Sequence, residues 1–170
     1  MAASHPPPQR PEPIFGTVVI AGVGLIGGSV ALGLRERFLA REVIGFDLEP
    51  ENLNHALGLG VIDSAKLEVG EWLRNADLVV FAVPVRALPD LIAQFAPFIG
   101  ADTLLTDVGS VKTSLLEATA GLGADLRGRF VGGHPMAGSE RGGVTNASAG
   151  LLQNAIWVLT PSADSSPRAV

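Results

Sequence analysis

The stretch TVVIAGVGLIGGS, residues 17–29, constrains the fold of this chain more than any other feature. Residues 17–22 are a β-branched apolar run that ends in glycine, which is typical of a buried strand. The next residues, GVGLIG at 22–27, form a G-x-G-x-x-G pattern. An apolar stripe at four-residue spacing then predicts a helix: Ile26, Val30, Leu34 and Phe38. A strand that turns on glycines into a helix is typical of a layered α/β domain.

The same alternation of strand and helix continues along the chain. Further strands are predicted at 42–47, 77–84, 103–107, 129–135 and 155–161. Helices are predicted at 49–60 and over two apolar stripes, which are Val85, Leu88, Leu91, Ile92 and Phe95, and Val111, Leu115, Ala118 and Leu122. This order predicts an α/β fold with a doubly wound, mostly parallel, Rossmann-type sheet and helices on both faces. A third strand should lie within 61–75, where AKLEV (65–69) is a thin candidate.

The composition narrows the class of function. A length of 170 residues fits one domain, and a net charge of −5 without a basic run argues against a nucleic-acid partner. The absence of cysteine excludes disulfides, a thiol nucleophile and cysteine metal ligands. No apolar stretch reaches the length of a membrane span, and the N-terminus lacks the apolar core of a signal peptide. We therefore expect a cytoplasmic protein without a membrane partner. The prolines of residues 1–13 predict a disordered tail, and the folded domain is expected at 14–170.

The glycine pattern allows two interpretations. It could be a structural turn, because the chain contains 21 glycines. Its position between a strand and a helix favours dinucleotide binding: Gly22 permits the tight turn, Gly24 lets the backbone approach a pyrophosphate, and Gly27 lets helix and strand pack closely. The helix N-terminus then offers N–H groups and partial positive charge to the phosphates.

Asp47 follows Gly27 by twenty residues, at the end of the second predicted strand. A carboxylate at this place can accept hydrogen bonds from the ribose hydroxyls of NAD and repels the 2′-phosphate of NADP. The residues after it, LEPEN, add acids and no arginine, so NAD is favoured over NADP. The alternative is that Asp47 caps the following helix, and both roles can coexist.

Ser110 lies in TDVGSVKTS (106–114), between a predicted strand and helix. It could cap that helix, but the loop lies at the carboxyl ends of the strands, where ligands bind in a doubly wound sheet. Lys112 in the first turn is poorly placed for the helix dipole, so structure or charge elsewhere explains it better.

His134 ends the strand predicted at 129–135, on the same edge of the sheet. It is either a hydrogen-bonded structural residue or a general base, since imidazole titrates near neutral pH. No metal site is expected, because no second histidine or cysteine is near in sequence. Gly132 and Gly133 are expected to leave room for a ligand beside the ring.

Three stretches taken together resemble one family. In their order and separation, GVGLIGGS (22–29), DVGSVK (107–112) and GGHPMAGSE (132–140) are similar to the prephenate/arogenate (cyclohexadienyl) dehydrogenases of tyrosine biosynthesis. The resemblance runs from about Thr17 to Pro161. It implies NAD-dependent oxidative decarboxylation of prephenate or arogenate, with hydride transfer to NAD and a histidine base.

The resemblance also implies roles for individual residues. His134 would take up the proton of the ring hydroxyl while hydride leaves the same carbon. Ser110 would contact that hydroxyl, the histidine or the nicotinamide. Glu140, with Gly138 and Ser139, would lie at the mouth of the site and modulate access or protonation. The residues expected to contact the cofactor are Gly22, Gly24, Leu25, Ile26, Gly27, Asp47, Val83, Pro84, Asp107 and Ser110.

One departure from the family concerns its second, helical domain, which completes the substrate pocket and forms the homodimer. The residues after Pro161 are too few to form it, so we expect an N-terminal portion that is inactive alone. Two alternatives stay open, namely another Rossmann dehydrogenase that acts on a hydroxy acid or an imine, and an NAD-binding module without turnover. The sequence does not distinguish prephenate from arogenate, and it says nothing of feedback inhibition by tyrosine.

Overall fold

A computed structural model describes residues 12–112, 119 and 121–170 of the chain. In this part, seven strands form one sheet in the order β3-β2-β1-β4-β5-β6-β7. The strands are β1 (Phe15–Ala21), β2 (Ala40–Phe46), β3 (Ser64–Lys66), β4 (Leu78–Phe81), β5 (Leu104–Asp107), β6 (Phe130–Pro135) and β7 (Trp157–Thr160). Strands β1 to β6 run parallel, and β7 pairs antiparallel with β6. The expected doubly wound, mostly parallel sheet is confirmed.

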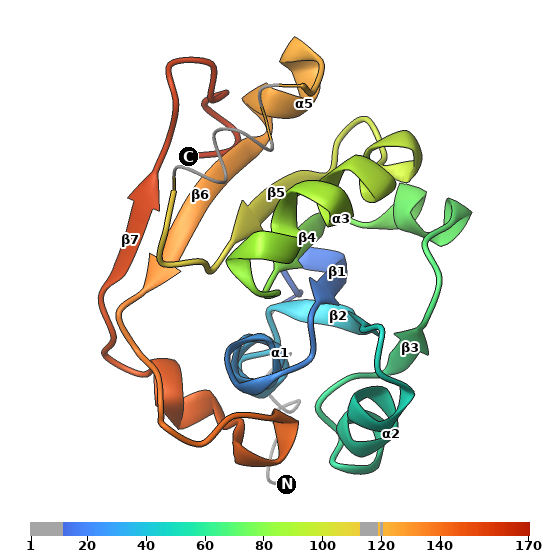
Figure 1. Cartoon of the computed structure of the whole chain (residues 1–170), viewed down its shortest axis with the longest axis vertical. Coiled ribbons are helices and arrows are strands. Elements are labelled where there is room, and N and C mark those ends of the chain that lie inside the picture. The colour runs from blue at the N-terminus through green and yellow to red at the C-terminus, as the bar shows by residue number, and fades with distance from the viewer. Residues whose placement is uncertain (1–11, 113–118, 120) are drawn as a thin grey trace, which may run out of the picture.

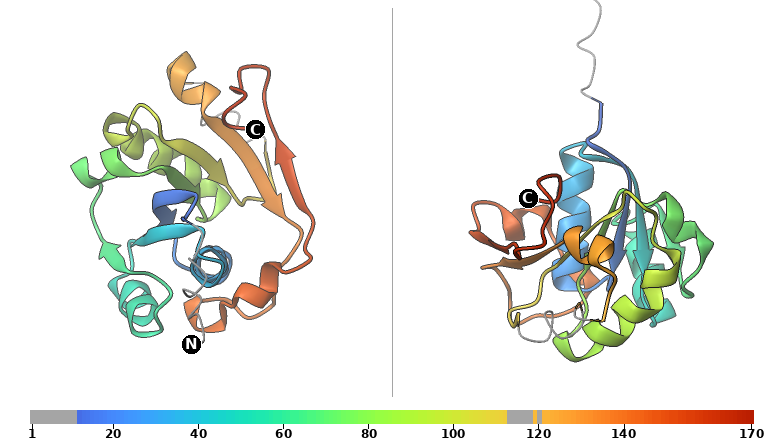
Figure 2. Two further views of the ribbon diagram at one scale, coloured as in Figure 1. Left: turned by 180° about the vertical axis from the view of Figure 1, so that it is seen from behind. Right: turned by 90° about the horizontal axis from the view of Figure 1, so that it is seen from above.

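Helices cover both faces of the sheet (Figures 1 and 2). They are α1 (Leu25–Glu36), α2 (Pro50–Gly58), α3 (Leu88–Phe95) and α5 (Ala124–Gly128), with 3₁₀ turns η1 (Glu71–Asn75), η2 (Val85–Ala87), η3 (Ala96–Phe98), η4 (Val144–Asn146) and η5 (Ala149–Leu152). Most of the helix predicted over 111–122 and most of the proline-rich tail lie outside the described residues. Of the helices described, none has both the length and the apolar character that a membrane crossing needs.

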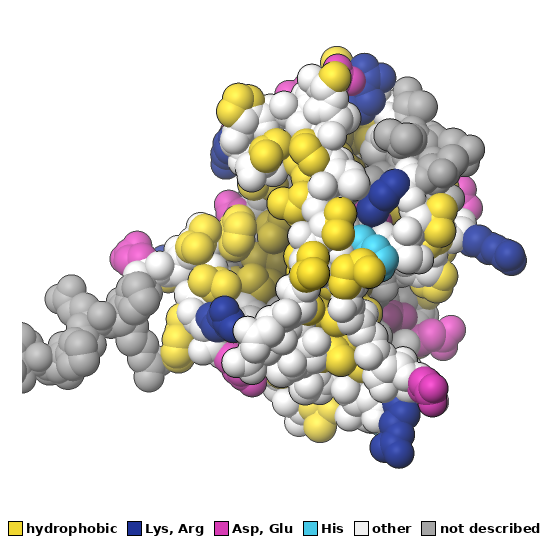
Figure 3. All heavy atoms as spheres, turned by 90° about the vertical axis from the view of Figure 1, so that its left-hand side faces the viewer, with side chains coloured by type: hydrophobic (Ala, Val, Ile, Leu, Met, Phe, Trp, Pro, Cys, Tyr) yellow, Lys and Arg dark blue, Asp and Glu magenta, His cyan; other side chains and the backbone are white. Residues whose placement is uncertain are grey.

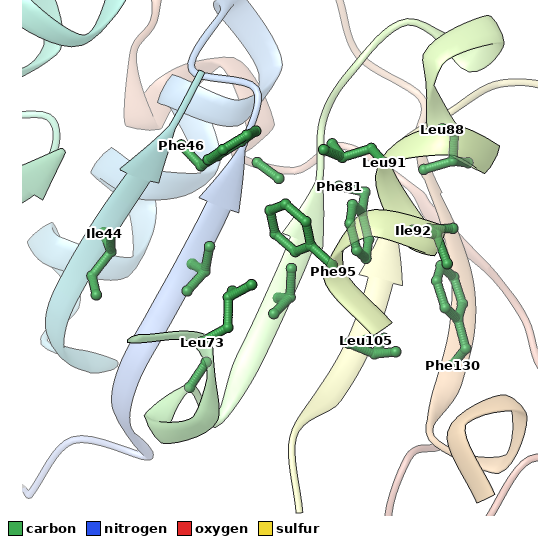
Figure 4. Close-up of a cluster of buried hydrophobic side chains, with 14 residues drawn as sticks. Ile44, Phe46, Leu73, Phe81, Leu88, Leu91, Ile92, Phe95, Leu105 and Phe130 are labelled. Atoms are coloured by element: carbon green, nitrogen blue, oxygen red, sulfur yellow. The ribbon is translucent and has the colours of Figure 1, made fainter. Parts of the chain in front are cut away.

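The face covered by α3 is built around aromatic side chains (Figure 4). Phe95 is fully buried, and its ring centroid lies 5.1 Å from that of Phe46 and 5.4 Å from that of Phe81. The predicted stripe is confirmed for Leu88, Leu91, Ile92 and Phe95, which α3 buries, whereas Val85 lies in η2 and is only partly buried. This packing holds α3 against the carboxyl ends of β2 and β4, where Phe46 and Phe81 lie.

The helix α1 is confirmed, and its predicted stripe is confirmed only in part, because Val30 and Leu34 pack against the core but are not its buried residues. The residues that α1 buries are small ones: Gly27, Gly28, Ser29 and Ala31. Val30 and Leu34 are only partly buried at the flanks of the core, and Phe38 lies past the helix end with φ +54° and 48% of its surface exposed. The helix approaches the sheet too closely for large side chains to lie between them.

The third strand of the first half is the short edge strand β3. It begins one residue before AKLEV and includes only the first two residues of that candidate. It pairs with β2 through three residues, Ile44 to Phe46. Such a short run carries little alternating pattern, which is why its signal in the sequence is weak.

Candidate active site

The site begins where β1 and β4 lie side by side. After β1 the chain passes to α1 on one face of the sheet, and after β4 it passes to α3 on the other face. Neighbouring strands with connections to opposite faces leave a crevice at their carboxyl ends, the usual ligand site of such sheets. A cleft of about 600 Å³ opens there, called the rim cleft below. Its lining residues are Gly22, Gly24, Phe46, Asp47, Leu48, Glu49, Asn52, Ala82, Val83, Pro84, Ala87, Asp90, Leu91 and Gln94.

The three glycines of the first motif have three different environments. Gly22 has φ +98°, and a Cβ there would lie 2.5 Å from the carbonyl oxygen of Ala82, so the turn requires glycine. A Cβ on Gly27 would lie 2.0 Å from the oxygen of Gly22, so α1 could not pack as it does. A Cβ on Gly24 would meet nothing within 4 Å. Nothing in the fold itself needs a glycine at this position, and the residue faces the rim cleft.

The N-terminus of α1 opens at the same place. Gly24 is its N-cap, with no side chain to accept the first N–H groups, and the first turn contains no acidic residue. An uncapped helix N-terminus carries unpaired N–H groups and partial positive charge. The end of α1 is therefore suited to a phosphate-bearing ligand that enters along Gly24.

Asp47 directly follows β2, and its carboxylate points back to the glycine loop. One oxygen accepts the backbone N–H of Val23 at 2.9 Å, and the other accepts the N–H of Glu49 at 3.0 Å. The amide of Asn52 lies 3.5 Å from the second oxygen. The N-cap of α2 is Glu49, so the alternative that Asp47 caps this helix is wrong. Because each carboxylate oxygen can accept two hydrogen bonds, Asp47 keeps acceptor capacity toward the cleft that it lines.

The charged residues that line the rim cleft are all acidic. Asp47, Glu49 and Asp90 line it, and no lysine or arginine is among the described residues that do so. Such a cleft disfavours an additional phosphate near Asp47. Asp90 and Gln94 belong to the cleft wall that sequence reasoning missed, as does Asn52. Asp90 and Gln94 lie on α3 between the positions of its apolar stripe, where the sequence pattern indicates a solvent-facing side chain.

The second motif is organised around Asp107, the last residue of β5. This carboxylate is 1% exposed, and it accepts hydrogen bonds from the N–H of Gly109 at 2.9 Å and the N–H of Gly133 at 3.1 Å. The ammonium of Lys112 lies 2.7 and 2.6 Å from its two oxygens. The prediction that structure or charge elsewhere explains Lys112 is confirmed. Asp107 faces these protein donors and does not line the rim cleft.

His134 lies near the carboxyl end of β6, half-buried, opposite Val158 of β7. The expectation that Gly133 leaves room for a ligand is wrong. A Cβ there would lie 2.6 Å from Nε1 of Trp157 and 2.7 Å from the oxygen of Asp107, so protein atoms already occupy that space. Gly133 instead allows β5, β6 and Trp157 to come close together.

The remaining predicted residues lie on loops at the same edge of the sheet or behind the cleft. Ser110 is exposed in the loop after β5, and Glu140, Gly138 and Ser139 are exposed in the loop after β6. Of the ten residues predicted to contact the cofactor, the rim cleft is lined by Gly22, Gly24, Asp47, Val83 and Pro84, and not by Leu25, Ile26, Gly27, Asp107 or Ser110. The bond from Gly133 to Asp107 connects the second motif with the third.

The proteins that this chain resembles agree with the site described above. The family model "Prephenate dehydrogenase, nucleotide-binding domain" matches residues 30–170. The chain belongs to the prephenate dehydrogenase family. A prephenate dehydrogenase of Lactococcus lactis subsp. cremoris (strain MG1363) is 42% identical over 144 residues, which are 84% of this chain and 40% of that protein.

Solved structures of prephenate dehydrogenase family members show the same fold. A. aeolicus prephenate dehydrogenase, crystallised with hydroxyphenyl propionate and NAD⁺, matches with a TM-score of 0.83 and 31% identity over 91% of this chain and 53% of that one. Synechocystis arogenate dehydrogenase matches with a TM-score of 0.79 and 29% identity over 89% of this chain and 52% of that one. The chain therefore spans about half the length of these relatives.

Proposed function

We propose that this chain binds NAD and supplies the proton-accepting histidine of a dehydrogenase that acts on prephenate or arogenate. The observation that carries the proposal is the rim cleft at the switch point between β1 and β4, with Asp47 and Gly24 in its wall. His134 lies on the same edge of the sheet, two strands beyond β4. The membership in the prephenate dehydrogenase family supports the assignment.

The residues of the rim cleft fit a dinucleotide. Asp47 would accept hydrogen bonds from the ribose hydroxyls, and Gly24 with the uncapped end of α1 would hold the pyrophosphate. Val83 and Pro84 would form the wall on the side of β4. The acids of the cleft favour NAD over NADP, whose extra phosphate they would repel. When bound, the nicotinamide supplies the acceptor for a hydride.

His134 would act on the substrate hydroxyl. The imidazole takes the proton of the O–H bond while the hydrogen on the same carbon leaves as hydride, so that a carbonyl forms. Loss of the ring carboxylate as carbon dioxide leaves its bonding electrons in the ring, which becomes aromatic, and the proton can return to the oxygen. Ser110 would contact the same hydroxyl, the imidazole or the nicotinamide, and Glu140, with Gly138 and Ser139, would lie at the entrance.

The rest of the substrate pocket would come from a part of the protein that packs against β7, the strand at one edge of the sheet. Apolar side chains gather on this face of the molecule (Figure 3). Met136, Ile156, Val158 and Leu159 are between 42% and 71% exposed there. An apolar surface of this kind is typical of a protein interface. We propose that a second, helical domain covers it, completes the substrate pocket and forms a homodimer.

Calorimetry of NAD and NADP binding to this chain tests the cofactor assignment, and we expect NAD to bind more tightly. A preference for NADP would overturn it. The substrate assignment needs a protein extended to the length of the relatives, in which NADH absorbance is followed with prephenate, arogenate and a small hydroxy acid. Oxidation of the hydroxy acid alone would favour another Rossmann dehydrogenase, and NAD binding without any turnover would favour a binding module.

A further inference from the structure

The ladder between β5 and β6 ends before the chain reaches His134. Its paired residues are Leu105 with Phe130 and Thr106 with Val131. Beyond this point side chains replace the ladder. The N–H of Gly133 donates to Asp107 at 3.1 Å, and the carbonyl oxygen of Gly133 accepts from Lys112 Nζ at 2.5 Å. The N–H and the carbonyl group of the residue before His134 are therefore both held by one ion pair, in which Asp107 is buried and Lys112 is partly buried.

The other side of Gly133 is held as firmly. Strand β7 pairs with β6 from Gly132 to Pro135, and the indole of Trp157 fills the space that a side chain on Gly133 would need. The backbone of β6 is thus enclosed between β7 and the side chains of Asp107 and Lys112. Since the peptide unit of Gly133 fixes the Cα of His134, the place from which the imidazole projects is fixed as well.

We propose that Asp107 and Lys112 form a clamp that positions His134 through Gly133. The inference rests on the proposed function, in which His134 is the proton acceptor. Asp107 and Lys112 are positioning residues, because they act through the backbone and Asp107 is closed off from the rim cleft. A catalytic base must lie within hydrogen-bond reach of the proton that it takes, so a small displacement of β6 reduces its efficiency.

A buried ion pair is weak evidence for stability by itself, because desolvation offsets most of the attraction between the charges. Side chains of similar size without charge often stabilise a fold equally well. A role in stability alone therefore predicts that the pair can be replaced without consequence for His134. A role in positioning predicts that the fold survives and the environment of His134 changes.

The test uses the full 170-residue chain and the double variant D107N/K112M, which removes both charges without leaving one buried alone. The matched control is D63N/R35M. Asp63 also pairs with an arginine and accepts a strand N–H, from Val43 at 2.8 Å, but it lies beside β2 and β3. Assignment of the imidazole signals is simple, since the chain has three histidines, at positions 5, 55 and 134, and His134→Asn identifies the relevant one.

Two NMR readouts at fixed pH decide the proposal. We expect the amide hydrogen of Gly133 to exchange about tenfold faster or more in D107N/K112M, as for loss of a hydrogen bond to a charged group. The imidazole signals of His134 should shift or broaden, while those of His55 stay unchanged. The control variant D63N/R35M should leave the amide exchange of Gly133 and the imidazole signals of His134 as they are in the wild type. Unchanged Gly133 exchange and unchanged His134 signals in D107N/K112M would overturn the clamp.

A second variant keeps the test decisive if the double variant does not fold. Lys112→Arg keeps the charge and the donors but replaces a compact ammonium by a larger planar group. We expect it to fold and to give His134 signals between those of the wild type and a displaced state; signals identical to the wild type would count against the clamp. Failure of the proposed function is a separate result, which would show as retained turnover after His134→Asn in the extended protein.

Discussion

The carboxylate of Asp47 accepts the backbone N–H of Val23 at 2.9 Å, and so joins the end of β2 to the glycine loop after β1. This bond fixes the acid beside the turn that opens the rim cleft. The same carboxylate lines the cleft, so one side chain both shapes the loop and presents a negative charge to a ligand. The two roles can be separated, because asparagine keeps an acceptor oxygen and loses the charge.

We therefore expect Asp47→Asn to bind NAD about tenfold to a hundredfold more weakly, as for loss of hydrogen bonds to a charged group. NADP binding should improve relative to NAD, because the repulsion of the 2′-phosphate is removed. Calorimetric titration of both nucleotides measures the two effects. Asp77→Asn is the matched control, since Asp77 also accepts backbone N–H groups, from Gly16 and Thr17 at the other end of β1. Equal losses in both variants would contradict the role of Asp47 in binding.

Two glycines of the first motif should respond to alanine in opposite ways. Gly24→Ala should fold normally, since its Cβ meets nothing within 4 Å, and should lose about tenfold or more in NAD affinity because it obstructs the approach of the pyrophosphate. Gly27→Ala should be destabilised by about 1–3 kcal/mol or more, because its Cβ would lie 2.0 Å from a backbone oxygen. Urea unfolding and NAD titration separate the two effects.

Gly33→Ala provides the control within the same helix, because a Cβ there also meets nothing within 4 Å. It should stabilise the protein by about 0.5–1 kcal/mol and leave NAD affinity unchanged. Weakened NAD binding in Gly33→Ala would show that helix α1 does not tolerate alanine in general, and the special role of Gly24 would then lose its support.

The parts of the site that the sequence predicted correctly depend on residues close together in the chain. The three glycines of the first loop have the geometry that their spacing predicts, and Asp47 lies at the strand end expected for it. A pattern of strand, glycine turn and helix is local, so its geometry follows from a few residues. The same reasoning was only partly right for the apolar stripe of α1, because the depth of helix packing depends on the sheet beneath it.

The parts that the sequence did not predict depend on residues far apart. The contact of Asp107 with Gly133 spans 26 positions, and the filling of the space at Gly133 depends on Trp157. Neither can be inferred from spacing, since both arise where three strands meet. The cleft wall made by Asp90 and Gln94 was missed because polar positions on a helix usually face solvent, and only the fold turns these two toward a cleft.

The aromatic core next to the cleft offers a test of stability. Phe95 is fully buried among Phe46, Phe81 and Trp72, with ring centroids 5.1 to 6.4 Å from its own. Phe95→Ala should lower the free energy of unfolding by about 3–5 kcal/mol, because a large cavity remains. Leu59→Ala, at a side chain that is 57% exposed, should change it by less than about 0.5 kcal/mol. Urea denaturation measures both, and similar small losses would mean that the core relaxes around the missing ring.

The proposed base is tested in a protein extended to the length of the relatives. His134→Asn should keep NAD affinity and lose about 10²–10⁴-fold in kcat, the range for removal of a general base. Ser110→Ala should lose less, because the serine is proposed to contact reacting groups without accepting the proton. Steady-state rates of NADH formation with prephenate measure both variants. Near-normal turnover of His134→Asn would assign the base to another residue.

The last prediction concerns the 170-residue chain itself, which should bind NAD and oxidise prephenate negligibly. Prephenate carries two carboxylates, while Lys112 is already paired with Asp107, and Arg141, in the loop after β6, is exposed and follows Glu140 directly. Solvent over the exposed β7 edge weakens each charge interaction with the substrate. Orientation of the reacting carbon, which is worth about 7–11 kcal/mol of barrier in a well-built site, would also be missing. Calorimetry measures NAD binding, and NADH absorbance after addition of prephenate to the same sample measures turnover. Robust turnover would show that residues 1–170 already hold the whole substrate pocket, and that the exposed apolar side chains of β7 serve another purpose.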